Sequence, residues 1–140
     1  MYALLAVALY GIATAYMLNE SGLNITIVEK NEMGMGVTAN TTAKLTSQHG
    51  LFYDYLVTNF SEDYARKYLE ANEEAITLVK SIVEKEHIDC DMEEQDAYVY
   101  TNVESEIPKI KEEVDSLESI GFDAEFVTET PLPFNVLRCY

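Results

Sequence analysis

The sequence predicts an α/β fold, in which a short parallel βαβ segment at the N-terminus precedes a mainly helical α+β segment. A β-branched run at residues 25–28 follows an apolar helical stretch and a glycine, which is the order of elements in a parallel βαβ unit. Helical periodicity of apolar residues then spans residues 62–87 and 107–120. An apolar content of 48% in 140 residues excludes a disordered chain despite the net charge of −16.

The N-terminal run up to residue 18 contains no charged side chain and is mostly apolar. A signal peptide would begin with a basic region and a membrane span would carry flanking Lys or Arg, and neither is present. A buried strand and helix are therefore favoured over a membrane or export role. We expect a strand over residues 1–5, although residues 4–9 could instead extend the next helix backwards. We expect that helix over residues 11–19, and Ser21 and Gly22 to end it.

Residues 24–50 hold the strongest functional signal in the chain. The predicted strand at residues 25–28 ends on Glu29, and a strand that ends on a carboxylate is how α/β nucleotide-binding domains hold a ribose. Residues 31–50 show no periodicity and form a long predicted loop. Long loops in compact domains are usually functional or disordered, and this one lacks the composition of disorder. A functional loop is therefore favoured.

The second segment is predicted to be mostly helical. A short aromatic helix covers residues 51–60, and Ser61 is expected to cap the next helix, which runs to about residue 87. Its expected core stripe consists of Tyr64, Tyr68, Ala71, Ala75, Leu78 and Ile82, widened by Leu69, Ile76, Val79 and Val83. The next helix spans 107–120, with Pro108 in its first turn and Gly121 at its end. Strands are expected at 96–101, 124–127 and, as an option, 88–92.

Charge and cysteine content exclude several classes of function. Most of the 25 acidic residues lie beyond residue 60, and an acidic surface repels phosphate backbones, so nucleic-acid binding is not expected. The ordinary interpretation of these charges is a solvated face. Cys90 and Cys139 lack the spacing of a zinc site or a disulfide framework, so we expect no metal and a cytoplasmic protein with reduced thiols.

Dinucleotide-binding domains need a glycine-rich turn, a helix N-terminus for the pyrophosphate and an acid about 20 residues further on. Glu29 is correctly placed for that acid. At the matching distance before Glu29, the three glycine positions of the motif are occupied by Ala6, Ala8 and Gly11, so only the third is a glycine. As a motif, this turn is a poor match.

Longer strings carry a more specific signal. The strings GIATAYMLNESGLNITIVEKN and GMGVTANTTAKLTSQHGLFYDYL resemble the N-terminal FAD-binding region of D-amino-acid-oxidase-like FAD-dependent oxidoreductases. The most similar branch often carries a C-terminal Rieske iron–sulfur domain. YLEANEEAI, DAYVYT and LPFNV extend the resemblance, which covers about residues 11–136. TTAKLTSQHG is its most specific part.

The resemblance implies a Rossmann-like FAD-binding domain, a β-rich substrate domain and the oxidation of amines or amino acids. It implies that Glu29 binds the adenosine ribose of FAD and that Lys30 lies on the adenine side. Three loop residues would line the pyrophosphate: Gly36, Thr38 and Asn40. Three more would approach the flavin ring: Thr42, Ala43 and Lys44. Lys44 near the flavin N1–C2 edge would stabilise the anionic reduced flavin. No catalytic residue is assigned.

Two departures from the family qualify these expectations. Ala6 and Ala8 add methyl groups where the turn needs glycine, which would weaken FAD binding. Family proteins are also several times longer, so we expect a fragment that is inactive alone. Residues 1–50 would be a partial FAD-binding domain with a degraded first strand and turn. Residues 51–140 would be a helical α+β segment of the substrate domain, incomplete at its C-terminus.

One alternative from another functional class remains open at this stage. The chain could be a non-catalytic acidic interaction module whose apolar N-terminal helix contacts a membrane or a partner protein. In the full-length family the expected partner is a small amine or amino-acid substrate. The sequence does not determine the oligomeric state.

Overall fold

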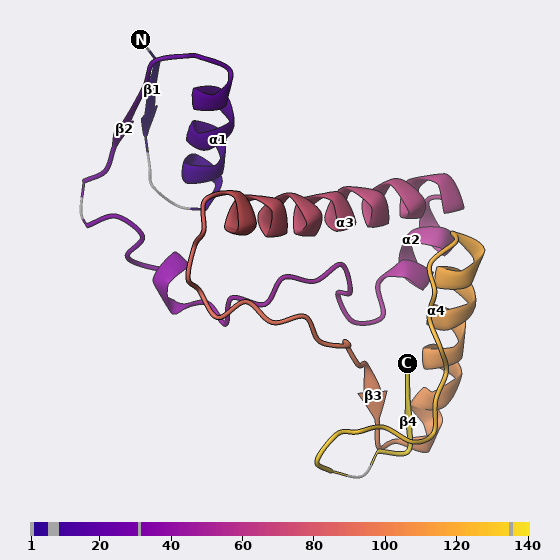
Figure 1. Ribbon diagram of the computed structural model, residues 1–140. Coiled ribbons are helices and arrows are strands. Elements are labelled where there is room, and N and C mark those ends of the chain that lie inside the picture. Colours follow the sequence, from indigo (N-terminus) through magenta and orange to yellow (C-terminus); the bar gives the residue numbers. More distant parts are fainter. Residues whose placement is uncertain (1, 6–8, 31, 135) are drawn as a thin grey trace. The chain divides into compact units, whose positions relative to one another are not determined.

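The computed structural model describes residues 2–5, 9–30, 32–134 and 136–140, and helices and strands occur in both halves of the chain (Figure 1). They form two compact units, Met1–Lys44 and Leu45–Tyr140, which we describe separately. Among the described residues, no helix combines the length and the apolar character that crossing a membrane requires.

The first unit contains two strands with a helix between them. β1 (Tyr2–Leu5) and β2 (Ile25–Val28) pair in parallel, and α1 (Leu9–Glu20) connects them along the chain. The parallel pairing and the position of the β-branched strand are as predicted. The expected burial of the helix is wrong, because Ala15 is the one buried residue in the described side chains of α1, and three of the four residues of β2 are exposed as well. Because β1 reaches Leu5, the alternative in which the helix extends back to residue 4 is wrong.

α1 ends in the way its sequence predicts. Gly22 has a φ of 77°, in the left-handed region that glycine adopts without steric cost. Its N–H donates to the carbonyl of Asn19, and the N–H of Leu23 donates to the carbonyl of Leu18. These two bonds form a Schellman motif, which satisfies carbonyls that the helix end would otherwise leave unpaired.

The second unit is built around three helices: α2 (Tyr53–Asn59), α3 (Glu62–Lys85) and α4 (Ile107–Ser119). Figure 1 shows α2 and α4 at the N-terminal end of the long helix α3. The buried core lies where these helices meet, because each turns its apolar side toward the others. It consists of Tyr53, Leu56, Ala65, Leu69, Ile110, Val114, Leu117, Ile120 and Tyr140.

α3 begins as predicted, but its inward face differs from the prediction. The Ser61 hydroxyl accepts a hydrogen bond from the N–H of Tyr64, so Ser61 caps the helix. The buried residues of α3 are Ala65 and Leu69, whereas Tyr64 and Leu78 from the expected stripe are exposed. The buried face of α3 is thus rotated from the expected stripe by one residue, about 100° around the helix axis. It lies on the side of Leu69, which was expected only to widen that stripe.

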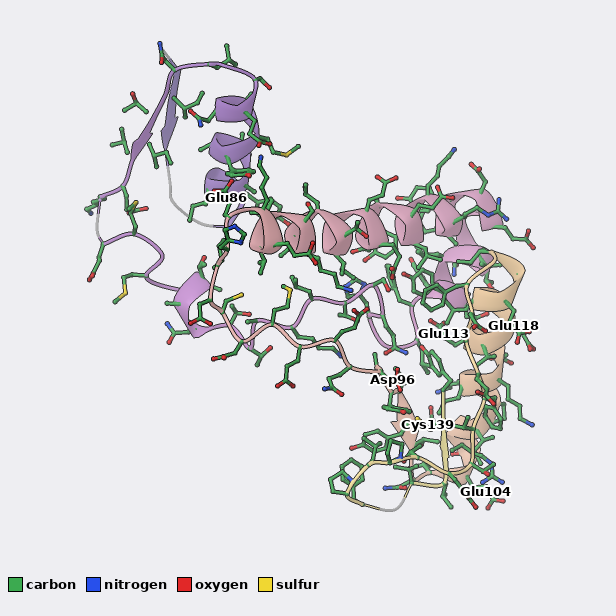
Figure 2. The ribbon with its side chains drawn as sticks, in the orientation of Figure 1. Glu86, Asp96, Glu104, Glu113, Glu118 and Cys139 are labelled. Atoms are coloured by element: carbon green, nitrogen blue, oxygen red, sulfur yellow. The ribbon has the colours of Figure 1, made fainter. Side chains whose placement is uncertain are left out.

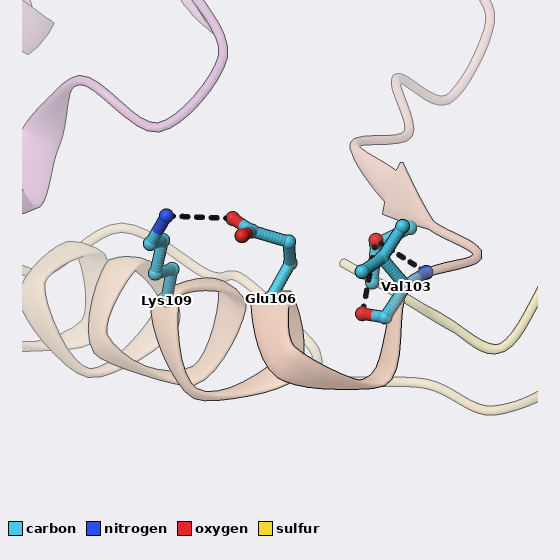
Figure 3. Close-up of polar contacts among 4 residues, drawn as sticks. Val103, Glu106 and Lys109 are labelled. Carbon is cyan, nitrogen blue, oxygen red and sulfur yellow. Dashed lines mark hydrogen bonds and ion pairs between the residues drawn. The ribbon is translucent and has the colours of Figure 1, made fainter.

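A short turn of helix and local polar contacts lie at the start of α4 (Figure 3). η2 (Glu104–Glu106) leads into it, and Pro108 lies in its first turn as predicted. Lys109 and Glu106 form an ion pair at 2.7 Å, and the N–H of Val103 donates to the Thr101 hydroxyl at 3.0 Å. The other end of α4 closes at Gly121, where φ is 88°.

Three extended segments form a minimal antiparallel arrangement beside α4. β3 (Tyr100–Thr101) pairs with β4 (Arg138–Cys139), and Val127 forms a bridge to Cys139 on the other side. The predicted strand at 96–101 is therefore shortened to β3, and the one predicted at 124–127 is reduced to the single bridge at Val127. Residues 88–92 contain no strand, and Cys90 within them is exposed.

Among the described residues, the core contains one acidic side chain, that of Glu113, which is 0% exposed. Glu113 belongs to α4 and is labelled in Figure 2. Its Oε1 accepts hydrogen bonds from the N–H groups of Phe52 and Tyr53 at 3.0 and 2.9 Å, and its Oε2 accepts from Asp54 at 2.7 Å. Burial raises the pKa of this carboxyl above its ordinary value, and the three N–H donors oppose that rise only in part. Glu113 thus replaces the side-chain cap that Phe52 cannot supply to α2.

The core assignment predicts unequal costs for two leucine truncations. Leu117 is 1% exposed and Leu78 is 40% exposed. Leu117→Ala should lower the free energy of unfolding by about 2–5 kcal/mol, because it removes buried methyl groups and leaves a cavity. Leu78→Ala should change it by less than about 1 kcal/mol. Urea unfolding followed by far-UV circular dichroism measures both, and equal losses would contradict the rotated stripe of α3.

The raised pKa of Glu113 predicts how stability depends on pH. The folded chain binds this proton more tightly than the unfolded chain, so the contribution of Glu113 is largest below the unfolded pKa of about 4.3 and is lost as the pH rises through the folded pKa. Asp54, Tyr53 and Tyr140 face the carboxyl. Urea unfolding from pH 4.5 to 7.5 should show the advantage of wild type over Glu113→Gln shrinking with pH. Glu112→Gln, on the exposed side of α4, should show no such trend.

Candidate functional site

The candidate site begins at the carboxyl ends of the two parallel strands. Leu5 pairs with Val28, so β1 and β2 end side by side. Glu29 follows β2 directly and is half-buried. Ligands of open α/β sheets bind outside the carboxyl ends of the strands. Glu29 therefore lies at the end of the strand pair where ligands of such sheets bind.

The start of α1 offers a complementary feature. α1 has no acidic residue in its first turn, so the partial positive charge of its N-terminus is not offset there. Gly11, the last of the three motif positions, is its third residue and is half-buried. The first two positions, Ala6 and Ala8, lie outside the described residues. A helix start next to a strand end is suited to an anionic group such as a phosphate.

The loop after β2 is folded by local hydrogen bonds. Gly36 has a φ of 87°, and its carbonyl accepts a bond from the Asn40 side-chain amide at 2.6 Å. Thr38 and Asn40 belong to η1 (Thr38–Asn40), one turn of 3₁₀-helix. A Cβ on Gly36 would meet nothing within 4 Å, so its backbone conformation, not crowding, is what favours glycine there. The three residues expected to line a pyrophosphate are therefore held in one turn.

The last part of this loop contains a strained residue. Ala43 has a φ of 55°, and its N–H donates to the Thr41 hydroxyl at 3.3 Å. A left-handed conformation costs a non-glycine residue roughly 1–3 kcal/mol and is concentrated at functional sites. Thr42 and Lys44 on either side are exposed, as is Lys30 after β2. The exposure of all three leaves their polar groups accessible to a ligand.

The candidate site thus has two parts. The strand and helix ends bring Glu29 and the region of Gly11 to the same end of the βαβ unit. The loop brings Gly36, Thr38 and Asn40 into one hydrogen-bonded turn. All nine sequence-predicted site residues lie in the first unit.

The second unit holds a cavity that the sequence did not indicate. Its volume is about 480 Å³, within the range of small-molecule sites. Four carboxylates and three tyrosines contribute to its wall, and no Lys or Arg does. The lining residues that matter chemically are Asp96, Asp123, Glu125, Glu129, Tyr53, Tyr98 and Tyr140. These residue types disfavour an anionic ligand in this cavity.

A buried polar network borders the same cavity. The Tyr53 hydroxyl donates to the carbonyl of Ser47 at 2.6 Å, and the Tyr140 hydroxyl donates to the carbonyl of Gly50 at 2.9 Å. The Tyr140 hydroxyl also lies 3.5 Å from Oε1 of Glu113. Burial raises the pKa of both tyrosines, so both hydroxyls keep their protons at neutral pH.

Glu113 is the residue that the sequence interpretation missed, although a signal was present. It lies three residues after Ile110 and four before Leu117, on the apolar face of the helix. A lone acid at such a position must find hydrogen-bond partners in the core. The partners themselves, about 60 residues away, could not be inferred from that spacing.

His49 and the two cysteines are further side chains with the chemistry for catalysis or metal binding. His49 contacts the Tyr68 hydroxyl through Nδ1 at 3.1 Å, with the two rings edge to face. In the part of the chain that the structure describes, no group of three His, Cys, Asp or Glu side chains could hold a metal ion. Both cysteines are free.

Comparison with known proteins identifies the family. The family described as FAD dependent oxidoreductase matches residues 9–133. The chain is 41% identical over 123 residues to YhfW of Bacillus subtilis (strain 168), which is named as a Rieske 2Fe–2S iron–sulfur protein. This alignment covers 88% of the chain but only 24% of the length of that relative. No solved structure matches the chain.

The resemblance inferred from TTAKLTSQHG and the neighbouring strings is confirmed by these matches, and the relative's name agrees with the Rieske-carrying branch. The chain belongs to the family of FAD-dependent oxidoreductases.

Proposed function

We propose that this chain binds FAD as part of a flavin-dependent oxidoreductase of amines or amino acids, through a partial Rossmann-like βαβ unit. The observation that carries the proposal is the position of Glu29 directly after β2, at the carboxyl end of a parallel pair of strands. The residue types fit FAD: a carboxylate suits the ribose hydroxyls, and a helix start without acids suits the pyrophosphate.

Each part of the cofactor would have its own contacts. Glu29 accepts hydrogen bonds from the adenosine ribose, and Lys30 lies on the adenine side. Gly36, Thr38 and Asn40 line the pyrophosphate from their shared turn, which the bond between Asn40 and Gly36 stabilises. The start of α1 near Gly11 faces the same phosphates.

The residues after η1 would adjust the flavin itself. Thr42, Ala43 and Lys44 approach the ring, and the left-handed backbone at Ala43 is supporting evidence that this stretch is shaped for a ligand. When bound, FAD supplies a hydride acceptor at N5. The Lys44 ammonium would then stabilise negative charge at the N1–C2 edge.

We limit the proposal for these 140 residues to cofactor binding. The relative that matches the chain is about four times as long, so substrate oxidation is proposed only for a protein of that length. We also propose a cytoplasmic location, which the two free cysteines support. The alternative of an acidic interaction module has no observation in its favour among the described residues.

FAD titration tests the proposal. The purified chain, incubated with FAD and then desalted, should retain the absorbance band that bound flavin shows at about 450 nm. Glu29→Gln should weaken the affinity about tenfold to a hundredfold, because it replaces a charged acceptor worth roughly 1.5–3 kcal/mol. Glu32→Gln, an exposed glutamate in the same loop, is the matched control and should bind as wild type. A colourless protein would remove the cofactor assignment.

The alanines in the phosphate turn give an independent prediction. Replacing Ala6 and Ala8 by glycine restores the residues that permit a tight turn and a close approach of the phosphate. The double variant should bind FAD at least tenfold more tightly, since each strained backbone site costs roughly 1–3 kcal/mol. Ala13→Gly, on the exposed side of α1, should give no gain. Fluorescence titration with FAD compares the three proteins, and unchanged affinity of the double variant would contradict the motif assignment.

A further inference from the structure

The segment that follows residues 42–44, called here the flavin loop, is held by three side chains, two of which, Glu113 and Tyr140, come from distant parts of the sequence. Three consecutive N–H groups, those of Phe52, Tyr53 and Asp54, donate to Glu113. Glu113 lies on α4 and is labelled in Figure 2. Two carbonyls upstream, those of Ser47 and Gly50, accept from the hydroxyls of Tyr53 and Tyr140. Four of these five hydrogen bonds tie residues 50–54 to Glu113 and Tyr140, and the fifth, from Tyr53 to Ser47, lies within the segment.

This network is a costly way to stabilise a short helix. A Ser, Thr, Asp or Asn at residue 52 would cap α2 locally and leave the core apolar. Instead the core contains a carboxylate, whose burial is unfavourable and which must be satisfied by several donors. The distant acid ties the position of residues 52–54 to α4. In the same way, Tyr140 ties residue 50 to the end of β4, which it directly follows.

We propose that Glu113, Tyr140 and Tyr53 are positioning residues that anchor the C-terminal end of the flavin loop. The proposal rests on the FAD-binding function proposed above. Lys44 lies three residues before Ser47, so by chain length alone its Cα stays within roughly 10 Å of the anchored Ser47. A fixed anchor reduces the number of conformations that Thr42, Ala43 and Lys44 must give up when the cofactor binds.

The three anchors should have different effects on the loop. The Tyr140 hydroxyl holds Gly50 and approaches Glu113, so Tyr140→Phe removes one anchor and keeps the packed ring. Tyr53→Phe removes the anchor at Ser47 in the same way. Glu113→Gln affects three donors at once, and its amide nitrogen cannot accept a hydrogen bond.

Hydrogen exchange of the full chain without FAD measures the anchoring directly. At a temperature where circular dichroism shows every variant folded, Tyr140→Phe and Tyr53→Phe should raise exchange across residues 46–54 about fivefold, and Glu113→Gln more than tenfold. Tyr100→Phe and Glu112→Gln, which alter exposed side chains, are matched controls and should leave exchange unchanged. Unchanged exchange in both tyrosine variants would overturn the anchoring, even if Glu113→Gln failed to fold.

FAD titration of the same folded variants then tests positioning. Tyr140→Phe and Tyr53→Phe should weaken FAD affinity about fivefold and shift the visible bands of the bound flavin, which a purely structural role would not do. If wild type binds FAD and both variants match it in affinity and band position, positioning is overturned while FAD binding stands. If wild type itself binds no FAD, the proposed function is wrong and the positioning role falls with it.

Discussion

The second unit depends on one buried carboxylate. Glu113 reaches from α4 to the first turn of α2 and satisfies three consecutive N–H groups that no nearby side chain caps. Without it, those donors would face an apolar core. The same oxygen lies beside the Tyr140 hydroxyl, which brings β4 to α2 and α4. One ionisable group therefore sets the mutual position of two helices and the last strand.

Local chemistry explains which elements the sequence predicted correctly. Ser61 caps α3, Pro108 begins α4, and Gly22 and Gly121 end α1 and α4 in left-handed conformations. Each of these signals acts within about one turn of helix, so it can be recognised without knowledge of the fold. β4 and the one-residue rotation of the α3 stripe could not be predicted, because both depend on partners far along the chain.

The candidate site likewise combines residues that the sequence singled out with a restraint that it did not indicate. Glu29 became a candidate because it ends a β-branched strand. Gly36, Thr38 and Asn40 became candidates because their loop resembles that of the family, whereas the turn that joins them was not predicted. The restraint on the following segment was not predicted. Its donors and acceptors are separated by up to 90 residues, and only a folded core brings Tyr140 to Gly50.

The parallel pair in the first unit has a consequence for how the chain behaves among its own copies. Among the described residues, β1 and β2 form a sheet of two strands, so each offers one unpaired edge, and Ile27 and Val28 are partly exposed. Such edges are templates for pairing with another strand. The net charge of −16 opposes that encounter by mutual repulsion, and dissolved salt weakens the repulsion. Ionic strength therefore controls how readily these edges meet.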